Sequence, residues 1–278
     1  MKSQPRTQAI RDWLQSATQQ LTAHNIQTAR LDAEIILAHT VHRSRTFLHA
    51  HGEDLIEPRL REIADARLAL RGDRTPIAYI IGHREFYGRQ FRVTPATLIP
   101  RPESETFIDL LNELLASSSG KPKKLVDVGT GSGILGITAK LEHPSLDVTL
   151  LDISRHALKV AETNAKLLDA DVAIIHSDLL ANYPPVADII VANLPYVDPS
   201  WERSPETDHE PELALFAKDD GLQLINTLIA QARSHLTPGS YLLLEADPRQ
   251  HTTIVDSASA HGFALREIRG FIVCLQTA

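Results

Sequence analysis

A glycine-rich turn at residues 127–133 is the part of the chain whose residue types and spacing point most directly to chemistry. Its sequence is Asp127-Val-Gly-Thr-Gly-Ser-Gly133; a short apolar run precedes it and a helix-like segment follows it. Glycines let the backbone turn tightly and approach a ligand closely, and the start of the following helix offers free N–H groups. A dinucleotide-binding fold usually carries G-x-G-x-x-G here, whereas this chain carries G-x-G-x-G after an acid. We therefore predict a cofactor-binding turn.

The turn resembles motif I of S-adenosylmethionine-dependent methyltransferases, in which the acid helps to hold the amino-acid part of the cofactor. That resemblance implies S-adenosylmethionine as the cofactor. The binding residues that it implies are Asp127, Gly129, Thr130, Gly131, Ser132 and Gly133. A glycine-rich turn without a ligand, or another nucleotide-binding fold, would carry similar residues, so both interpretations stay open at this point.

Two further acids follow the next two expected strands. Asp152 ends the strand expected at 148–152, where an acid of a doubly wound sheet accepts hydrogen bonds from both hydroxyls of a ribose. Asp178 follows the strand expected at 172–176 and can accept from an adenine amino group, while Leu179 covers the adenine face. The alternatives are a helix cap at Asp152 and a solvated turn at Asp178.

The segment Asn193-Leu-Pro-Tyr196 directly follows a fourth apolar strand and has the residues to act on a planar nitrogen. Such a nitrogen is a weak nucleophile because its lone pair is delocalised. The side-chain oxygen of Asn193 and the backbone carbonyl of Leu194 can each accept one N–H, which orients the nitrogen toward a sulfonium methyl and stabilises its growing positive charge. Tyr196 can pack against the flat target group, and no protein nucleophile is required. The candidate catalytic residues are Asn193, Leu194, Pro195 and Tyr196, with Asn193 also bordering the cofactor; the alternative is a turn that closes the strand.

The first seventy or so residues carry apolar side chains at helical spacing. Three stretches show this pattern, at residues 10–21, 31–39 and 59–70. Beyond them, residues 85–93 look like two short strands on either side of Gly88. We therefore expect three parts: a helical domain over 1–75, a hairpin connector over 76–105 and a Rossmann-like domain over 106–278.

Strands and helices alternate after a helical segment at residues 106–115. Helical patterns separate the first five strands, which predicts an α/β fold with a mostly parallel, doubly wound sheet. The last two strands are split only by Arg269-Gly270, which indicates an antiparallel hairpin at the sheet edge. Seven strands with this terminal hairpin resemble the class I S-adenosylmethionine methyltransferase fold. The expected strands are 125–128, 148–152, 172–176, 188–192, 241–245, 264–268 and 271–275.

Composition narrows the function classes. The 278 residues carry a net charge of −7, which argues against a broad phosphate-binding surface, and we expect no stable nucleic-acid partner. No apolar run reaches membrane-spanning length, and the polar start at residues 1–6 lacks the apolar segment of a signal peptide, so we expect a cytoplasmic protein with no membrane partner. Cys274 is the single cysteine and is expected to be a buried structural thiol. Paired cysteines and H-E-x-x-H spacing are absent, so we expect no metal site.

Residues 193–196 resemble the N-P-P-Y motif of methyltransferases that act on amide or exocyclic nitrogens. The chain as a whole resembles the bacterial peptide chain release factor N(5)-glutamine methyltransferases of the HemK type. This resemblance implies that the substrate is the glutamine in the Gly-Gly-Gln loop of class I release factors, that the helical domain recognises the body of the factor, and that the loop reaches Asn193. The segments that carry it are 29–38, 76–82, 86–91, 97–105, 127–133, 193–196, 209–215 and 242–245, with 98–105 the most specific.

The chain departs from the family pattern in three places. Leu194 replaces the first proline of the motif, Ala246-Asp-Pro replaces Ile-Gly after Glu245, and the tail lacks a basic finish. Asn-Leu-Pro-Tyr also occurs in ribosomal RNA adenine dimethyltransferases, but an enzyme that acts on RNA should have a basic surface. The alternatives are a ribosomal-protein glutamine methyltransferase, a nucleic-acid adenine N-methyltransferase and a cofactor-binding module without catalysis.

Several charged residues lie in segments expected near the site. Arg101, Glu103 and Glu105 are predicted either to position substrate or cofactor, or to form a set of ion pairs that anchors the hairpin. The irregular segment 197–218 is expected to form a lid, and its Glu210 and Glu212 are expected to be solvated surface residues.

Overall fold

The computed structural model of the chain describes residues 8–116, 123–184 and 186–277. The polar start at residues 1–6 lies outside the described residues. The chain divides into two compact units: one runs up to Gly82 and includes Ser204–His209, and the other contains His83–Arg203 and the chain from Glu210 onward. The three-part division with boundaries at residues 75 and 105 remains a prediction.

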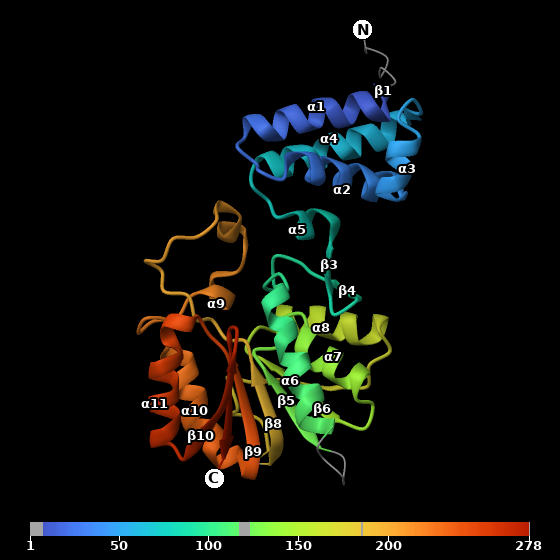
Figure 1. Ribbon diagram of the computed structural model, residues 1–278. Coiled ribbons are helices and arrows are strands. Elements are labelled where there is room, and N and C mark those ends of the chain that lie inside the picture. The colour runs from blue at the N-terminus through green and yellow to red at the C-terminus, as the bar shows by residue number, and fades with distance from the viewer. Residues whose placement is uncertain (1–7, 117–122, 185, 278) are drawn as a thin grey trace. The chain divides into compact units, whose positions relative to one another are not determined.

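The first unit is mainly helical, as predicted. Its three longer helices, labelled in Figure 1, are α1 (Ile10–Ala23), α2 (Ala29–Val41) and α4 (Pro58–Gly72). Their apolar faces share one buried core. Shorter elements are also present, and the helical pattern does not predict them because they are shorter than the window in which periodicity can be recognised. They are β1 (Gln8–Ala9), which pairs with β2 (Leu55–Ile56), and the helices α3 (Arg45–Ala50) and α5 (Ile77–Ile81).

The second unit begins with the predicted hairpin. Its strands are β3 (His83–Phe86) and β4 (Arg89–Arg92), which pair antiparallel. Tyr87 and Gly88 form the two-residue turn, with φ of 49° and 72°, as a type I′ hairpin turn requires. The helix α6 (Glu105–Ala116) follows and leads toward the sheet.

A seven-stranded sheet forms the centre of the second unit and confirms the predicted fold class. Its strand order is β10-β11-β9-β8-β5-β6-β7. The five strands β5 to β9 are all parallel to one another. The β10–β11 hairpin lies at one edge, where β11 pairs antiparallel with both β9 and β10. The strand β9 begins at Leu236 rather than at residue 241. The sequence prediction missed its first five residues because the pair Pro238-Gly239, which is typical of a turn, lies inside the strand. The pairing of β8 with this part of β9 contains a register shift. The strands are β5 (Lys124–Val128), β6 (Asp147–Asp152), β7 (Ala173–His176), β8 (Ala187–Ala192), β9 (Leu236–Glu245), β10 (Phe263–Arg269) and β11 (Ile272–Thr277).

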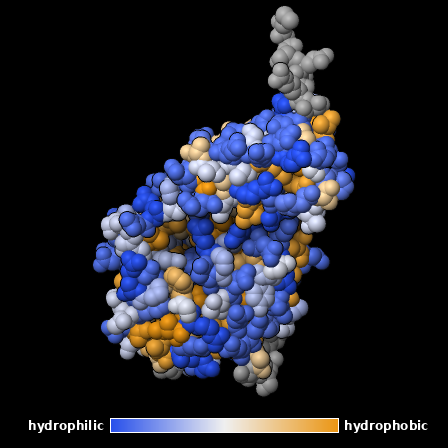
Figure 2. All heavy atoms as spheres, turned by 45° about the horizontal axis from the view of Figure 1, so that its top comes forward, coloured by the Kyte–Doolittle hydropathy of each residue, from blue (hydrophilic) through white to orange (hydrophobic). Residues whose placement is uncertain are grey.

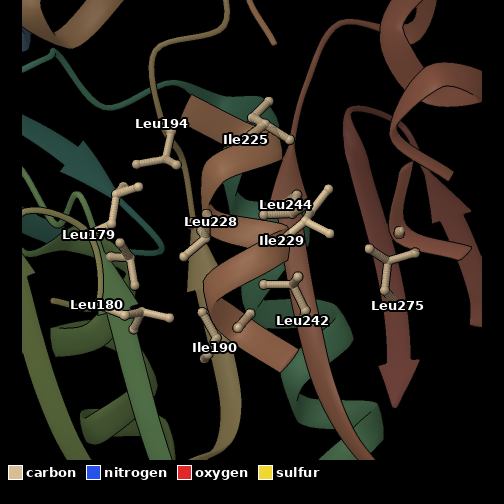
Figure 3. Close-up of a cluster of buried hydrophobic side chains, with 14 of the residues drawn as sticks. Leu179, Leu180, Ile190, Leu194, Ile225, Leu228, Ile229, Leu242, Leu244 and Leu275 are labelled. Atoms are coloured by element: carbon tan, nitrogen blue, oxygen red, sulfur yellow. The ribbon is translucent and has the colours of Figure 1, made fainter. Parts of the chain in front are cut away.

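Helices cover both faces of this sheet (Figure 1). Alternate residues of a strand point to opposite faces, so β8 contributes Ile190 to one core, and Ile189 and Val191 to the other. Figure 3 shows the first core, in which the helix α10 lies against Ile190 and Leu244. The helices of this face are α10 (Gln223–His235) and α11 (His251–Ala260), and those of the other face are α6, α7 (Ile134–Glu142) and α8 (Arg155–Leu167).

Cys274 belongs to the second of these cores. It is a buried free cysteine in β11, and burial raises the pKa of its thiol to about 11. A thiol with this pKa remains protonated near neutral pH and is a poor nucleophile. The prediction of a structural thiol is therefore confirmed.

Figure 2 draws one face of the molecule by hydropathy. The face drawn in Figure 2 is mostly hydrophilic, with hydrophobic residues between charged and polar ones. Within the described ranges, no helix combines the length and the apolar character needed to cross a bilayer.

Candidate active site

The predicted site residues gather where the winding of the sheet reverses. The chain passes from β5 outward through β6 to β7, and then crosses to β8 on the other side of β5. The carboxyl ends of β5 and β8 therefore flank a topological switch point, which is where doubly wound sheets bind ligands. A cavity of about 190 Å³ lies there. Its wall includes Asp127, Gly129, Thr130, Gly131, Ser132, Asp152, Asp178, Leu179, Asn193, Leu194 and Pro195.

Two predicted residues are placed behind this wall. Gly133 directly precedes α7, and its N–H donates to the carbonyl of Thr130 at 2.8 Å. Tyr196 directs its hydroxyl to Glu245. Both residues therefore support the segments that line the cavity and are not among the lining residues.

Asp127 holds the glycine-rich turn in shape. Its Oδ2 accepts from the hydroxyl of Thr130 at 2.6 Å and from the backbone N–H of Gly136 at 2.9 Å, so it ties the turn to the first turn of α7. Because Asp127 is buried, its pKa is raised to about 6. The structure thus adds a supporting role to the ligand contact that the motif implies.

Gly129 brings the cofactor turn and the Asn193 segment into direct contact. A Cβ at Gly129 would lie 2.8 Å from Cδ2 of Leu194, closer than real side-chain contacts allow. Gly131 differs, because a Cβ there would meet nothing of the protein within 4 Å. Gly131 also belongs to the cavity wall, so its surroundings suit the close approach of a ligand.

Asp152 supports both the turn and the start of α8. Its Oδ2 accepts from the N–H of Gly131 at 2.9 Å, and its Oδ1 accepts from the N–H of Ser154 at 2.8 Å. Ser154, and not Asp152, is the capping residue of α8, since its hydroxyl accepts from the N–H of Ala157. A carboxylate oxygen has two lone pairs, so acceptor capacity remains for ribose hydroxyls. Burial raises the pKa of Asp152.

Asp178 and Leu179 meet the cavity in different ways. Asp178 is exposed at its rim, whereas Leu179 is buried in the wall. Leu179 has φ of 47°, in the left-handed region that is uncommon for leucine. Its side chain belongs to the same apolar cluster as that of Leu194 (Figure 3).

A chain of hydrogen bonds links Asn193 to a buried carboxylate. The side-chain nitrogen of Asn193 donates to the hydroxyl of Ser104 at 3.2 Å, and that hydroxyl donates to Oε2 of Glu245 at 2.6 Å. The hydroxyl of Tyr196 donates to the other oxygen, Oε1, at 3.2 Å. Burial raises the pKa of Tyr196, so its phenol is protonated and able to donate at neutral pH.

The backbone of Tyr196 is fixed by the segment that departs from the family pattern. Asp247 and Pro248 begin a short 3-10 turn, and this turn places Gln250 beside Tyr196. The side-chain nitrogen of Gln250 donates to the carbonyl of Tyr196 at 2.9 Å and to that of Asp220 at 2.7 Å. The Ala246-Asp-Pro sequence thus has a clear role at the rim of the sheet.

Leu194 replaces a proline of the family motif, and its side chain is buried. It is only 5% exposed and lies in the apolar core with Leu179 and Ile225 (Figure 3). Side-chain packing therefore restrains a position at which a proline ring would restrain φ. The backbone carbonyl on which the predicted contact depends is the same in both residues.

The prediction for Glu210 is wrong. Glu210 is buried, its Oε2 accepts from the N–H of Ile99 at 3.0 Å, and its Oε1 pairs with the guanidinium of Arg101. Glu210 therefore fastens the end of the irregular segment to the loop that holds Ile99 and Arg101, both of which line the cavity. Glu212, by contrast, is exposed, as predicted.

The other two acids of the connector differ from each other. The carboxylate of Glu105 accepts from the N–H of Tyr87 at 2.8 Å, which anchors the hairpin turn, whereas Glu103 is exposed. The ends of the expected lid are held together, because Val197 donates to the carbonyl of Leu215 at 3.1 Å and accepts from the N–H of Ala217 at 3.2 Å. The segment therefore forms a loop whose two ends are hydrogen-bonded to each other.

Sequence reasoning did not assign roles to Ser104, Glu245 and Gln250. Ser104 lies within the most family-specific stretch, and Glu245 ends a predicted strand. An acid at the carboxyl end of an apolar parallel strand was a usable signal for Glu245, since the same signal identified Asp152. No comparable local signal marks Gln250.

Comparison with known proteins agrees with the sequence and the fold. Residues 12–82 match the family described as the PrmC N-terminal domain, and residues 104–207 match the methyltransferase small domain. The chain is also similar to solved structures that share its fold. One is a methyltransferase from Pyrococcus furiosus (TM-score 0.52, 15% identity, 76% of this chain and 95% of that one). Another is the 16S rRNA N2 G1207 methyltransferase of Thermus thermophilus (TM-score 0.52, 16% identity, 70% of this chain and 49% of that one).

Relatives are similar over most of the chain. The release factor glutamine methyltransferase of Deinococcus radiodurans is 36% identical over 257 residues, which cover 91% of each chain. That of Coxiella burnetii is 34% identical over 262 residues (94% of this chain and 93% of the relative), and that of Escherichia coli K12 is 36% identical over 237 residues (84% of each). The chain therefore belongs to the release factor glutamine methyltransferase family.

Proposed function

We propose that this protein transfers a methyl group from S-adenosylmethionine to the side-chain nitrogen of the glutamine in the Gly-Gly-Gln loop of class I peptide chain release factors. The names of its relatives support a release factor glutamine as the target. One structural observation carries the proposal. Asn193 lines the same cavity as the glycine-rich turn, and its side-chain nitrogen already donates to Ser104, which leaves its oxygen to accept an N–H of the substrate.

The cavity suits S-adenosylmethionine. We expect Asp152 to accept from the ribose hydroxyls, Asp178 and Leu179 to contact the adenine, and Asp127 to attract the amino-acid part. In support, all four residues line the cavity, and a Cβ at Gly131 would meet nothing within 4 Å. When bound, the cofactor supplies a methyl group on a positively charged sulfur.

The chain itself contributes orientation and electrostatic stabilisation. The oxygen of Asn193 and the carbonyl of Leu194 accept the two N–H groups of the target amide and hold its nitrogen in line with the methyl group. Both oxygens also stabilise the positive charge that develops on the nitrogen during transfer. Gln250 and Glu245 hold Tyr196 in place from the backbone side and the hydroxyl side, which keeps the four-residue segment rigid.

We also propose that the helical domain, expected over residues 1–75, recognises the body of the release factor. The match of residues 12–82 to the PrmC N-terminal domain supports a recognition role for this part of the chain. In this scheme the connector at 76–105 and the domain at 106–278 receive the Gly-Gly-Gln loop. The release factors named by the relatives make the cytoplasm the expected location.

Label transfer tests the proposed function. The purified protein is incubated with methyl-labelled S-adenosylmethionine and an unmodified class I release factor, and the label is located by peptide mass spectrometry. We expect label on the Gly-Gly-Gln glutamine and none on a factor in which that glutamine is replaced by alanine. Label on a ribosomal protein or on adenine instead would contradict the proposed substrate.

Cofactor affinity should fall as the pH is lowered through about 6, the value to which burial raises the pKa of Asp127. A protonated Asp127 no longer attracts the cationic amino group, so the Kd should rise about tenfold per pH unit below 6. Calorimetric titration of S-adenosylmethionine between pH 5 and 8 measures this dependence.

The stability of the free protein should change in the opposite sense. Between pH 6 and the ordinary value of 3.8, the folded chain binds this proton more readily than the unfolded chain, so its protonation stabilises the fold as the pH falls.

Asp127→Asn is the matched variant for this prediction. The asparagine oxygen can still accept from Thr130 and Gly136, so the turn should be preserved while the charge is lost. We expect weaker binding and a flat profile between pH 5 and 7. An unchanged slope in the variant would mean that another group causes the pH dependence.

A further inference from the structure

We propose that Ser104 and Glu245 form a positioning relay that fixes the orientation of the side-chain amide of Asn193, with its nitrogen toward Ser104 and its oxygen toward the cavity. The inference rests on the proposed function, because it matters only if the oxygen of Asn193 must face the target nitrogen. It assigns a function in the reaction to two residues that lie behind the cavity wall and do not touch the substrate.

The geometry of the sheet places the relay behind Asn193. In the parallel pairing of β8 with β9, Ala192 lies opposite Leu244, so the next residues along each strand, Asn193 and Glu245, emerge side by side at the carboxyl edge. Ser104 is fully buried at the end of the short 3-10 turn before α6 and lies between them. The relay therefore joins three segments that are distant in sequence.

The direction of every hydrogen bond follows from the chemistry of the groups. The hydroxyl of Ser104 uses its single proton to donate to Oε2 of Glu245, and this direction is fixed while Glu245 is ionised, because a carboxylate can only accept. The hydroxyl oxygen of Ser104 then has only lone pairs for Asn193, and it must face the NH₂ group of the amide. The opposite end of that amide, its oxygen, is thereby turned away from Ser104 and toward the cavity.

Glu245 is unusual for a residue that would serve packing alone. It is only 2% exposed, and the side chains that donate to it, the hydroxyls of Ser104 and Tyr196 and the amide of Asn193, are all neutral. A buried carboxylate without a cationic partner destabilises a fold, and an apolar residue of similar size would serve packing better. Burial raises the pKa of Glu245, while the hydrogen bonds from Ser104, Tyr196 and Asn193 favour its ionised form. A role in setting the direction of the relay explains why a carboxylate is present here although its burial destabilises the fold.

An asparagine held the wrong way round would present NH₂ to the N–H of the target amide. Two donors would then face each other, and the substrate nitrogen would lose both its orientation and its charge stabilisation. Cofactor binding involves other walls of the cavity and should not change. The relay therefore predicts a defect in turnover with little change in binding.

Two variants test the relay, Ser104→Ala and Glu245→Gln. The first removes the acceptor that faces the NH₂ group of Asn193. The second keeps the shape but introduces an NH₂ group that can donate to Ser104, so the serine proton is released toward Asn193 and the whole chain can reverse. We expect kcat for methylation of the release factor to fall about ten- to a hundredfold in each variant, while the KM for the factor and the Kd for S-adenosylmethionine change by about twofold or less.

The double variant separates a relay from two independent effects. Members of one hydrogen-bond chain are not additive, so the loss in Ser104→Ala/Glu245→Gln should be clearly smaller than the product of the two single losses. Ser240→Ala is the matched control. Ser240 is also a buried serine with hydrogen-bonded neighbours, but it lies at the other end of β9, about 17 Å along the strand from Glu245. It should retain the kcat of the wild type.

Melting temperatures show whether a variant remains folded. Glu245→Gln replaces a buried charge by a neutral group of the same shape and should keep its melting temperature, so it decides the question even if Ser104→Ala does not fold. A kcat within about twofold of the wild type in Glu245→Gln, or losses that multiply in the double variant, would overturn the relay. A wild-type protein that fails to methylate the release factor would overturn the proposed function itself, which is a different result.

Discussion

Replacing Asn193 by alanine is expected to abolish methyl transfer to the release factor while leaving cofactor binding intact. The alanine removes the oxygen that accepts one N–H of the target and that stabilises the charge growing on its nitrogen. Loss of one such group typically lowers kcat about a hundred- to a thousandfold. Steady-state turnover assays with labelled S-adenosylmethionine measure kcat, and calorimetry measures the Kd of the cofactor.

Asn182→Ala provides the control for this variant. Asn182 lies in the turn after β7, where its side chain bonds to the carbonyl of His176, and it is not part of the cavity wall. We expect its kcat to match that of the wild type. Turnover retained in Asn193→Ala would show that the amide of the substrate is held by other groups and would refute the mechanism.

The same assay addresses the alternative of a cofactor-binding module without catalysis. Leu194 was the only residue of the sequence that suggested this alternative. Its side chain is buried in the core beneath the cavity, so the motif backbone is restrained by packing where a proline would restrain it covalently. A catalytically competent segment is therefore compatible with leucine at this position.

Much of the fold could be predicted because its signals are local. The order of strands and helices from β5 to β11 follows from apolar runs, their spacing and the turns between them, all of which lie within short windows. Elements such as β1 and β2, of two residues each, carry no such signal. They form because Gln8 and Ile56 are brought together by the packing of longer helices.

The site was predictable to the extent that it follows the ends of strands. Asp127 is the penultimate residue of β5, Asp152 ends β6 and Asn193 directly follows β8, and the topology then brings them to one edge. Glu210 could not be predicted in this way, because its partners Ile99 and Arg101 lie more than a hundred residues away. Acids in irregular segments are usually solvated, so the general expectation was wrong here.

The relay could not be predicted for a similar reason. Ser104 and Glu245 are separated by 141 residues, and a serine before a helix is ordinarily interpreted as a cap. Only the pairing of β8 with β9 shows that Glu245 and Asn193 are neighbours. Roles that depend on the register of distant strands become visible only in the folded chain.

Replacing Gly221 by alanine is expected to damage the site severely without touching a residue of the cavity wall. A Cβ at Gly221 would lie 1.9 Å from the carbonyl oxygen of Tyr196 and 2.6 Å from the side-chain nitrogen of Gln250. These two atoms are hydrogen-bonded to each other, so neither can move without breaking the contact that fixes Tyr196. We expect the free energy of unfolding to fall by about 2–5 kcal/mol, the sum of backbone strain and overpacking, and kcat to fall about a hundredfold as the Asn193–Tyr196 segment shifts.

Gly239→Ala separates the two causes. Gly239 has nearly the same φ as Gly221, 80° against 82°, but a Cβ there would meet nothing within 4 Å. It should therefore lose only the strain contribution of about 1–2 kcal/mol and keep its kcat. Denaturant titration and turnover assays of both variants distinguish strain from displacement. Equal losses of stability in the two, or full turnover in Gly221→Ala, would show that the Tyr196 carbonyl is not held in place by this close approach, and the rigidity assigned to the motif would have to come from Glu245 alone.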